Sequence, residues 1–207
     1  MRACGRCLLE RRETAVKVLA FNGSPRKGGN TQTLLAEAVR GAKEMGAEVT
    51  VHDLNWMNIR PCQHCGGCDN EARCIVLDDM QVVHQEIREA DRIILASPIF
   101  FFGLSAQTKA MVDRCQAFWA AKYLHGKPIP EGLQGRKGLL LLVGGMTKDE
   151  KNPGFECSGV TAKAFFRTVN VPKHETLGYG SIDEKGAILK HPTALQEAYE
   201  AGKALAK

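Results

Sequence analysis

The sequence predicts one α/β domain built around a doubly wound parallel sheet. Three observations lead to this prediction: apolar runs of strand length alternate with helical patterns, the strands read as nearly continuous apolar runs, and a glycine-rich turn joins the first strand to the first helix. With 207 residues, 44% of them hydrophobic, the chain is long enough to bury the core of such a domain without disulfides.

The alternation of strands and helices begins at residue 16. Strands are expected near residues 16–21, 48–54, 92–97, 137–143 and 174–181, with helices from residue 30, over 79–89, 105–122 and 158–169, and from residue 193. Right-handed crossovers then place helices on both faces of the sheet. Five parallel strands suit the flavodoxin-like order 2-1-3-4-5, in which a ligand sits beyond the carboxyl ends of the first and third strands. Three loops are predicted to meet there: 22–31, 97–104 and 144–154.

The remaining bulk properties limit the class of protein. Residues 1–15 are predicted to be a disordered tail before a domain that covers 16–207, and Cys4 and Cys7 in that tail lack the second pair that a metal site needs. No run reaches the roughly 18 apolar residues of a membrane helix, and no secretory signal is visible, so we expect a soluble, cytoplasmic protein with reduced cysteines. The net charge of +5 is scattered along the chain, which argues against a nucleic-acid partner.

The turn over residues 22–31 has the composition of a phosphate-binding loop. It precedes the first helix, where backbone N–H groups and the helix dipole favour an anion. Ser24 and Thr31 offer hydroxyls, Asn30 offers an amide, and Arg26 offers a guanidinium that matches phosphate oxygens. The Lys and Ser/Thr of a nucleoside-triphosphate loop are absent, as is a G-x-G-x-x-G dinucleotide pattern. An ordinary glycine-rich turn is the remaining alternative.

This loop resembles the phosphate-binding segment of the NAD(P)H-dependent FMN reductase and iron–sulfur flavoprotein families. The likeness continues through residues 97–114, SPIFFFGLSAQTKAMVDR. The resemblance implies an FMN cofactor whose phosphate is held by Ser24, Arg26, Asn30 and Thr31, and whose isoalloxazine ring lies against Pro98, Ile99, Phe100 and Phe101, with Gly103 and Gly144 also in the site. Relatives often carry Tyr at the position of Phe100, so a hydroxyl contact is missing here. The phenylalanines from 100 to 102 also suit core packing or a subunit contact.

Four cysteines with close spacing occupy the segment 56–77, which is inserted after the second strand. Cys62, Cys65, Cys68 and Cys74 follow the pattern C-x2-C-x2-C-x5-C. Such a run is typical of a [4Fe–4S] cluster, while a zinc site, a redox dithiol and structural cysteines remain as alternatives. Residues 61–80 also resemble the compact cysteine motif of iron–sulfur flavoproteins, including the sequence Asp-Asp-Met at 78–80.

The predicted strand order also suggests where the cysteines lie. The first and second strands are neighbours, and the phosphate loop and the cysteine segment follow them directly. We therefore expect both to open onto the same edge of the sheet, so that cluster and FMN share a face. Of the other cysteines, Cys115 falls on the apolar stripe of its helix and is expected to be buried and inert, whereas Cys157 follows a Pro-Gly turn near the third loop.

The resemblance implies a flavin-dependent oxidoreductase in which FMN exchanges electrons with a [4Fe–4S] cluster. Electrons are expected from ferredoxin or NAD(P)H, with NAD(P)H as a substrate, and are passed to a small acceptor. No catalytic acid, base or nucleophile is predicted. The alternatives are an NAD(P)H-dependent flavin, quinone or nitro-compound reductase without a working cluster, and a non-catalytic binding module stabilised by zinc. Phe118 and Trp119, together with the phenylalanines from 100 to 102, predict a homodimer or homotetramer.

Overall fold

The computed structural model describes residues 15–130, 135–149 and 153–207. Cys4, Cys7 and all of the predicted disordered tail except residue 15 lie outside the described residues. None of the helices in these three ranges is both long and apolar enough to cross a membrane.

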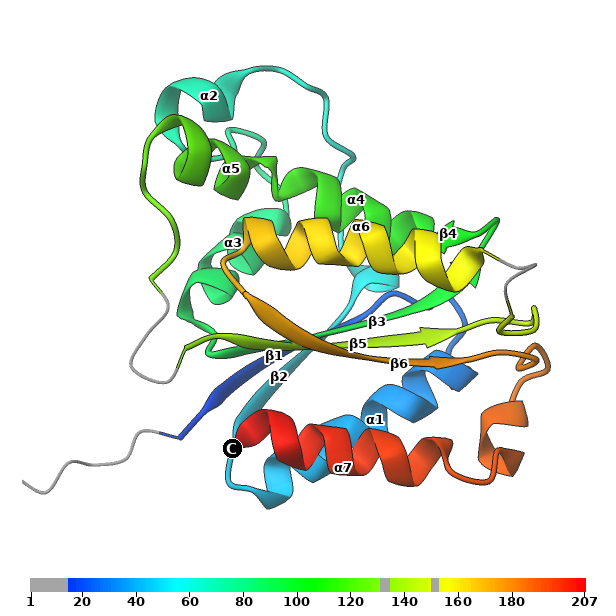
Figure 1. Cartoon of the computed structure of the whole chain (residues 1–207). Coiled ribbons are helices and arrows are strands. Elements are labelled where there is room, and N and C mark those ends of the chain that lie inside the picture. Colours follow the sequence, from blue (N-terminus) through cyan, green and yellow to red (C-terminus); the bar gives the residue numbers. More distant parts are fainter. Residues whose placement is uncertain (1–14, 131–134, 150–152) are drawn as a thin grey trace, which may run out of the picture.

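A parallel sheet forms the middle layer of the domain (Figure 1). Its strands are β1 (Lys17–Asn22), β2 (Glu48–Asp53), β3 (Arg92–Phe100), β5 (Lys137–Val143) and β6 (Lys173–Tyr179), in the order β2-β1-β3-β5-β6. Because β5 and β6 are the fourth and fifth parallel strands, this is the predicted 2-1-3-4-5 order. A short sixth strand that was not predicted, β4 (Gly103–Leu104), pairs antiparallel with the end of β3.

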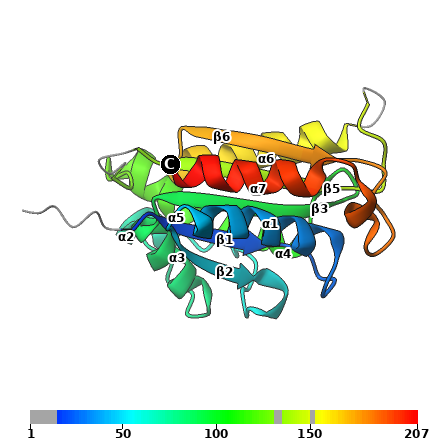
Figure 2. The ribbon, with the colours of Figure 1, turned by 90° about the horizontal axis from the view of Figure 1, so that it is seen from below.

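Helices cover both faces of the sheet (Figures 1 and 2). On one face α1 (Asn30–Glu44) and α7 (Ala194–Ala206) pack against each other and enclose an apolar core. On the other face α3 (Met80–Glu89), α4 (Ala106–Arg114) and α6 (Gly154–Thr168) enclose a second core. The short helices are α2 (Gly67–Glu71), α5 (Gln116–Trp119), the 3-10 turns η1 (Leu54–Trp56) and η3 (Ala187–Lys190), and the π-helical η2 (Ala120–Leu124).

The helix predicted over residues 105–122 is divided into α4, α5 and η2. Cys115 ends α4 with a ψ of 2°, which turns the chain before α5 begins. The widened π turn of η2 then carries Tyr123 and Leu124 to the surface, where each is about half exposed. Phe118 is only 2% exposed, so the expectation that it lies at a subunit contact is wrong, and Trp119 is the member of that pair that reaches solvent.

Candidate functional site

A cleft opens beyond the carboxyl ends of β1, β3 and β5, where the three predicted loops meet. It has a volume of about 270 Å³, just below the roughly 300–1,000 Å³ typical of ligand pockets. The lining residues are Ser24, Pro25, Arg26, Gly29, Asn30, Thr31, Pro98, Ile99, Phe100, Val143, Gly144, Gly145, Ile182 and Asp183. Eight of the predicted cofactor residues are among them. The turn after β6, which supplies Ile182 and Asp183, was not predicted, because its sequence carries no recognisable ligand motif.

The phosphate loop is supported from below by the start of α4. Ser105 caps that helix, accepts a hydrogen bond from the Thr108 backbone N–H, and donates to the carbonyl oxygen of Gly23 at 2.6 Å. A Cβ atom on Gly23 would lie 1.8 Å from the Thr108 hydroxyl oxygen, so the loop passes where only glycine fits. The resembling segment 97–114 therefore both lines the cleft and holds the phosphate loop in place.

The residues of the loop that were predicted to bind an anion lie at the amino end of α1. Ser24 and Thr31 are buried beside the cleft, and the first turn of α1 contains no acidic residue that would repel an anion. The backbone N–H groups of this first turn have no partner within the helix and can face a ligand. Arg26 lines the cleft and donates from Nη1 to the carbonyl oxygen of Asp183 at 3.0 Å.

Asn30 has a different set of contacts. Its Nδ2 donates to the carbonyl oxygen of Glu184 at 2.8 Å, and its Oδ1 accepts from the backbone N–H of Gly186 at 2.9 Å and of Ile188 at 3.3 Å. The side-chain amide thus fastens the segment after β6 to the phosphate loop. A contact between this amide and a cofactor phosphate remains a prediction, and Ser24, Arg26 and Thr31 are the better-placed side chains.

The predicted aromatic wall separates into one inward and one outward residue. Phe100 lines the cleft, whereas Phe101 is fully exposed and is not among the lining residues. Phe101 and Phe102 form the two-residue turn between β3 and β4, with φ values of 47° and 62°. This is the left-handed geometry of a tight hairpin turn, which points the Phe101 ring into solvent. Gly103 follows in β4, also outside the cleft lining.

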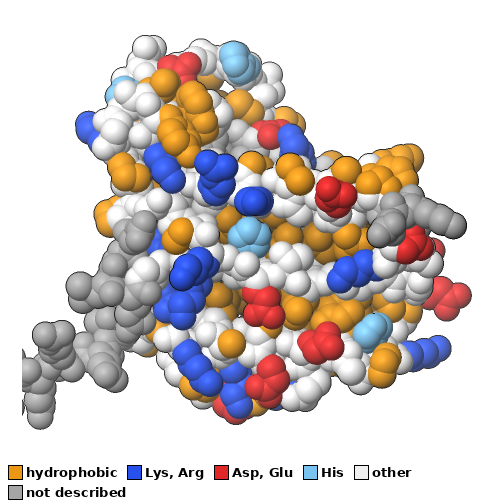
Figure 3. All heavy atoms as spheres, in the orientation of Figure 1, with side chains coloured by type: hydrophobic (Ala, Val, Ile, Leu, Met, Phe, Trp, Pro, Cys, Tyr) orange, Lys and Arg blue, Asp and Glu red, His pale blue; other side chains and the backbone are white. Residues whose placement is uncertain are grey.

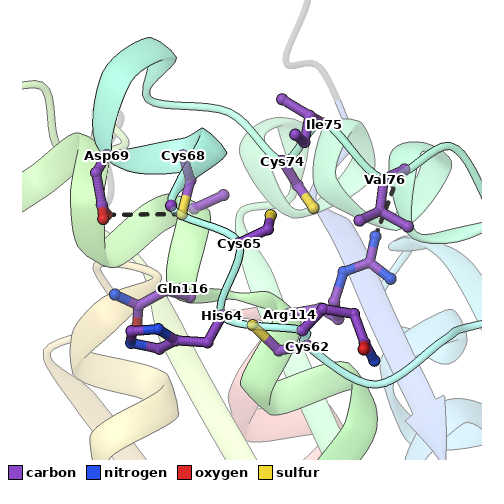
Figure 4. Close-up of a pocket in the computed structure, with 13 residues that line it drawn as sticks. Cys62, His64, Cys65, Cys68, Asp69, Cys74, Ile75, Val76, Arg114 and Gln116 are labelled. Carbon is purple, nitrogen blue, oxygen red and sulfur yellow. Dashed lines mark hydrogen bonds between the residues drawn. The ribbon is translucent and has the colours of Figure 1, made fainter.

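The four predicted cluster ligands surround one pocket on a different part of the molecule (Figure 4). Cys62, Cys65, Cys68 and Cys74 line one side, and Arg114, Gln116 and Ala117 from the junction of α4 and α5 line the other. Within the described part of the chain, no three His, Cys, Asp or Glu side chains are arranged to hold a single metal ion. Burial, together with the neighbouring Asp69 carboxylate, raises the pKa of the Cys68 thiol. The cysteines therefore share a pocket without converging on one point.

A buried ion pair fixes both ends of the cysteine loop. Arg114 and Asp78 have side-chain exposures of 1% and 0%, and two nitrogens of the guanidinium contact the carboxylate at 2.7 and 3.0 Å. Arg114 also donates to the carbonyl oxygens of Arg60 at 2.7 Å and Val76 at 3.3 Å, one on each side of the loop. Burial alone would raise the pKa of Asp78, but hydrogen bonds from Arg114 and from the backbone of Arg60 and Met80 lower it.

The expectation that the cysteine loop and the phosphate loop open onto the same edge is wrong. The two pockets have no lining residue in common, and they lie at opposite ends of α4. Ser105 and Thr108 at the start of α4 support the phosphate loop, whereas Arg114 at its end binds the cysteine loop. A nine-residue helix separates the two ends by about 14 Å. The contacts of Arg114 draw the segment after β2 back along the helical layer, away from the carboxyl ends of the strands.

Burial confirms the expectation for Cys115. Its side chain is 1% exposed, and burial raises the pKa of its thiol far above the usual range, so it stays protonated and unreactive. Cys157 is exposed on α6 and lines neither pocket.

Comparison with known proteins identifies the family of the chain. A family model described as NADPH-dependent FMN reductase matches residues 16–150. An iron–sulfur flavoprotein of Methanocaldococcus jannaschii is 34% identical over 152 residues, which are 73% of this chain and 71% of that protein. An iron–sulfur flavoprotein of Archaeoglobus fulgidus is 34% identical over 128 residues, 62% of each chain. This and two other iron–sulfur flavoproteins are matched over only 51% to 64% of their own length.

Solved structures with low sequence identity share the fold. An NAD(P)H:quinone oxidoreductase from Methanothermobacter marburgensis superposes with a TM-score of 0.69 at 20% identity, covering 93% of this chain and all of that one. An FMN-dependent NADH-azoreductase from Bacillus anthracis gives 0.65 at 15% identity, again covering 93% of this chain and all of that one. These confirm the flavodoxin-like architecture. Taken with the family match over most of the chain, they lead to one conclusion: this chain belongs to the NADPH-dependent FMN reductase family.

Proposed function

We propose that this chain is a flavin-dependent oxidoreductase that binds FMN in the cleft beyond β1, β3 and β5 and a [4Fe–4S] cluster in the cysteine pocket. Electrons enter from ferredoxin or NAD(P)H and leave to a small acceptor. The observation that carries the proposal is the presence, in one domain, of a phosphate loop at the amino end of α1 and of four cysteines around a single pocket. We also propose that the protein works in the cytoplasm as a homodimer or homotetramer.

The cleft has the groups that FMN requires. Ser24, Thr31 and Arg26 line the cleft at the helix terminus, where they would bind a dianionic phosphate, while Pro98, Ile99 and Phe100 would give an apolar wall for a planar ring. Bound there, FMN supplies a centre that accepts two electrons and releases them one at a time. The residues of the cleft would bind the phosphate, orient the flavin ring and exclude water from the face of the ring that lies against the apolar wall.

The spacing of the cysteines favours a cluster over zinc, because a C-x2-C-x2-C run with a fourth cysteine nearby is typical of [4Fe–4S], whereas zinc sites more often pair two C-x2-C units across a longer arm. All four cysteines line one pocket. In a four-iron cluster each cysteine binds a different iron, so the thiolates surround a larger core. Cys62, Cys65, Cys68 and Cys74 would hold it, and it would supply one-electron chemistry.

The test is anaerobic purification followed by quantification of iron, sulfide, zinc and FMN. We expect about four irons per chain, broad absorption near 400 nm and bound FMN. Cys65→Ala should lose the iron and keep FMN. The matched control is Cys157→Ala, because Cys157 is exposed and lies outside both pockets, and it should keep both cofactors. Stoichiometric zinc would contradict the cluster and leave an FMN reductase, and colourless protein that takes up no FMN would contradict the whole proposal.

A further inference from the structure

A second cleft, lined by cations, lies at the amino end of β6, on the edge of the sheet opposite the FMN cleft. We call it the basic cleft and define it by Lys122, Lys163, Arg167 and His174, with Tyr123 at its wall. Its volume is about 340 Å³; its lysine and arginine residues come from η2 and α6, and His174 comes from β6. Lys and Arg side chains gather near the end of α6 that faces α5 in the space-filling view (Figure 3).

The positive charge of the basic cleft has no counter-charge in its walls. None of its lining residues, all of which are described, is acidic. Lys163, Arg167 and the adjoining Lys173 are exposed and take part in none of the ion pairs found among the described residues. Burial and the nearby Lys163 lower the pKa of His174. Cations gathered in this way from separate elements create a positive field that attracts an anionic partner.

The basic cleft borders an exposed aromatic surface. Tyr123 packs on Trp119 with ring centroids 5.6 Å apart, and the side chains of Trp119, Tyr123 and Leu124 are 38%, 48% and 52% exposed. Lys122 is held at the boundary, where its Nζ donates to the carbonyl oxygen of Arg167 at 2.8 Å. An apolar, aromatic centre beside a charged rim is the usual anatomy of a protein-binding surface.

The same short helical segment joins this surface to the cysteine pocket. Residues of η2 contact α2, and His125 at its end hydrogen-bonds through Nε2 to the carbonyl oxygen of Asp69 at 2.8 Å. Ala117 lines the cysteine pocket and Tyr123 lines the basic cleft, six residues further on. Six helical residues correspond to about 9 Å. A partner in the basic cleft is therefore close to the cysteines, while the FMN cleft lies beyond the far end of α4.

We propose that the basic cleft and the adjoining Trp119, Tyr123 and Leu124 form the docking surface for an acidic protein that carries single electrons. This rests on the proposed function, because the docked carrier would exchange electrons with the cluster in the cysteine pocket. With Cys62, Cys65, Cys68 and Cys74 holding the cluster, one electron would pass from the reduced carrier, which would be oxidised, to the oxidised cluster, which would be reduced, with no bond made or broken. A hydride donor has to reach the flavin ring, so it uses the FMN cleft instead. The two kinds of donor thus enter at opposite ends of α4.

Binding to a redox-inactive, gallium-substituted ferredoxin with an acidic surface tests the docking surface without requiring a cluster. We expect the affinity of the wild-type protein to fall as salt is raised, since rim charges act over a Debye length of about 10 Å at 0.1 M salt. The double variant Lys163→Glu with Arg167→Glu should bind at least about tenfold more weakly. The control, Lys43→Glu with Lys190→Glu, reverses two exposed charges on the opposite face and should change binding less than about twofold.

Three outcomes of this titration overturn the proposal. One is equal binding by the basic-cleft variant and its control, with both folded and loaded with FMN. Another is equal affinity for a single-stranded oligonucleotide of similar charge, which would assign the basic cleft to polyanions in general. The third is a change of oligomeric state in the basic-cleft variant, which would assign the surface to a second copy of the chain.

Anaerobic stopped-flow reduction separates this proposal from the proposed function. Reduced ferredoxin should bleach the absorption near 400 nm rapidly in the wild type and at least about tenfold more slowly in the basic-cleft variant. Reduction of bound FMN by NAD(P)H should be the same in both. Wild-type protein that binds the gallium carrier but contains no iron would contradict the cluster and leave the docking surface standing. A basic-cleft variant reduced as fast as the wild type would overturn the docking surface alone.

Discussion

His84 is a buried histidine held in its neutral form. It is 3% exposed, its Nε2 hydrogen-bonds to the carbonyl oxygen of Arg114 at 3.0 Å, and burial lowers its pKa to about 4. An unfolded histidine has a pKa of about 6.5, so between these values the unfolded chain binds more protons than the folded one. The stability from this histidine is therefore complete above about pH 6.5 and is lost as the pH falls towards 4.

Urea unfolding at two pH values measures this linkage. Between pH 8 and pH 5, the free energy of unfolding of the wild type should fall by about 2 kcal/mol more than that of His84→Gln. Glutamine keeps a donor for the carbonyl oxygen of Arg114 but does not titrate. Identical pH dependence in the two proteins would show that His84 is not the group responsible.

Substitution of Arg26 tests whether this residue binds the phosphate of FMN. We expect Arg26→Ala to weaken FMN binding by about 1.5–3 kcal/mol and riboflavin binding much less, because only FMN carries the dianion that a guanidinium meets. Lys27→Ala is the control, since Lys27 is an exposed cation of the same loop that does not line the cleft. Fluorescence titration of the cofactor-free protein with each flavin gives the comparison. Equal losses for both flavins would place the phosphate elsewhere.

At the scale of single residues, the sequence predicted the groups that stand in a motif and missed those that act across the fold. Ser24 and Thr31 were predicted because a glycine-rich turn before a helix has a local signature. Arg114 was missed as a structural centre, although it ends the segment that resembles the family. Its partners at positions 60, 76 and 78 lie far away in sequence. An arginine in a helical pattern reads as solvent-facing, and burial can be assigned only once its partners are known.

The hairpin turn between β3 and β4 is an element with a strained backbone. Phe101 and Phe102 both have positive φ values, a conformation that costs a residue with a Cβ about 1–2 kcal/mol and costs glycine little. We expect Phe102→Gly to be more stable than Phe102→Ala by about 1 kcal/mol, the reverse of the usual order. Both variants lose the ring, so their difference isolates the backbone. Chemical denaturation measures the free energy of unfolding of each variant. A Phe102→Ala variant that is as stable as Phe102→Gly, or more stable, would contradict the strain.

The cysteine loop is an element whose order depends on the ion pair of Arg114 and Asp78. Arg114→Gln leaves a buried carboxylate without its partner, which costs about 3–5 kcal/mol where the structure does not relax. We expect faster amide exchange over residues 58–78 and loss of iron, with FMN retained. Arg60→Gln is the control, because the Arg60 side chain is 60% exposed and lies 3.8 Å from the same carboxylate. Equal exchange in both variants would refute this role.

Helices and strands were predicted well where the apolar pattern is strong. They were predicted poorly where local backbone geometry determines where an element begins or ends. The three central strands β1, β3 and β5 were found because each is a nearly continuous apolar run, whereas β2 and β6 at the sheet edges are more polar and were placed by the alternation of strands and helices. The break of the predicted helix 105–122 at Cys115 was not found, because no proline or glycine marks it. The π turn of η2 likewise has no compositional signal. The sixth strand β4 depends on a turn of two phenylalanines, a sequence that is atypical of left-handed turns.

At the scale of the whole molecule, the strand order was predictable and the position of the cysteine loop was not. Alternating strands and helices restrict a five-stranded parallel sheet to few topologies. A long insertion after β2 is free to run in any direction, and its path is set by contacts with α4 that lie 36 to 54 positions away in sequence. The family resemblance identified the cysteines but carried no information on that path.

The exposed Phe101 ring predicts self-association. It is fully exposed at the tip of its turn, and such a ring gains stability when a second subunit covers it. We expect light scattering at micromolar concentration to give at least twice the chain mass of 22.6 kDa. Phe101→Ala should shift the mass towards that of the monomer, whereas Val160→Ala, a change at an exposed apolar residue of α6, should not. A monomeric wild type would contradict this assembly.

The hydrogen bonds between Asn30 and the segment after β6 determine when the phosphate loop can be completed during synthesis. The hydrogen bonds of the Asn30 side-chain amide join positions that are 154 to 158 residues apart in sequence. The phosphate loop is therefore completed by the segment 184–188, near the end of the chain. A ribosome adding about 5–20 residues per second needs on the order of ten seconds to cover that distance. Until then β1 and α1 have emerged without the closing segment and without α7, the main packing partner of α1. We therefore expect cofactor uptake to be a late step in the biogenesis of the protein, so that a nascent chain stalled before residue 180 should not retain FMN.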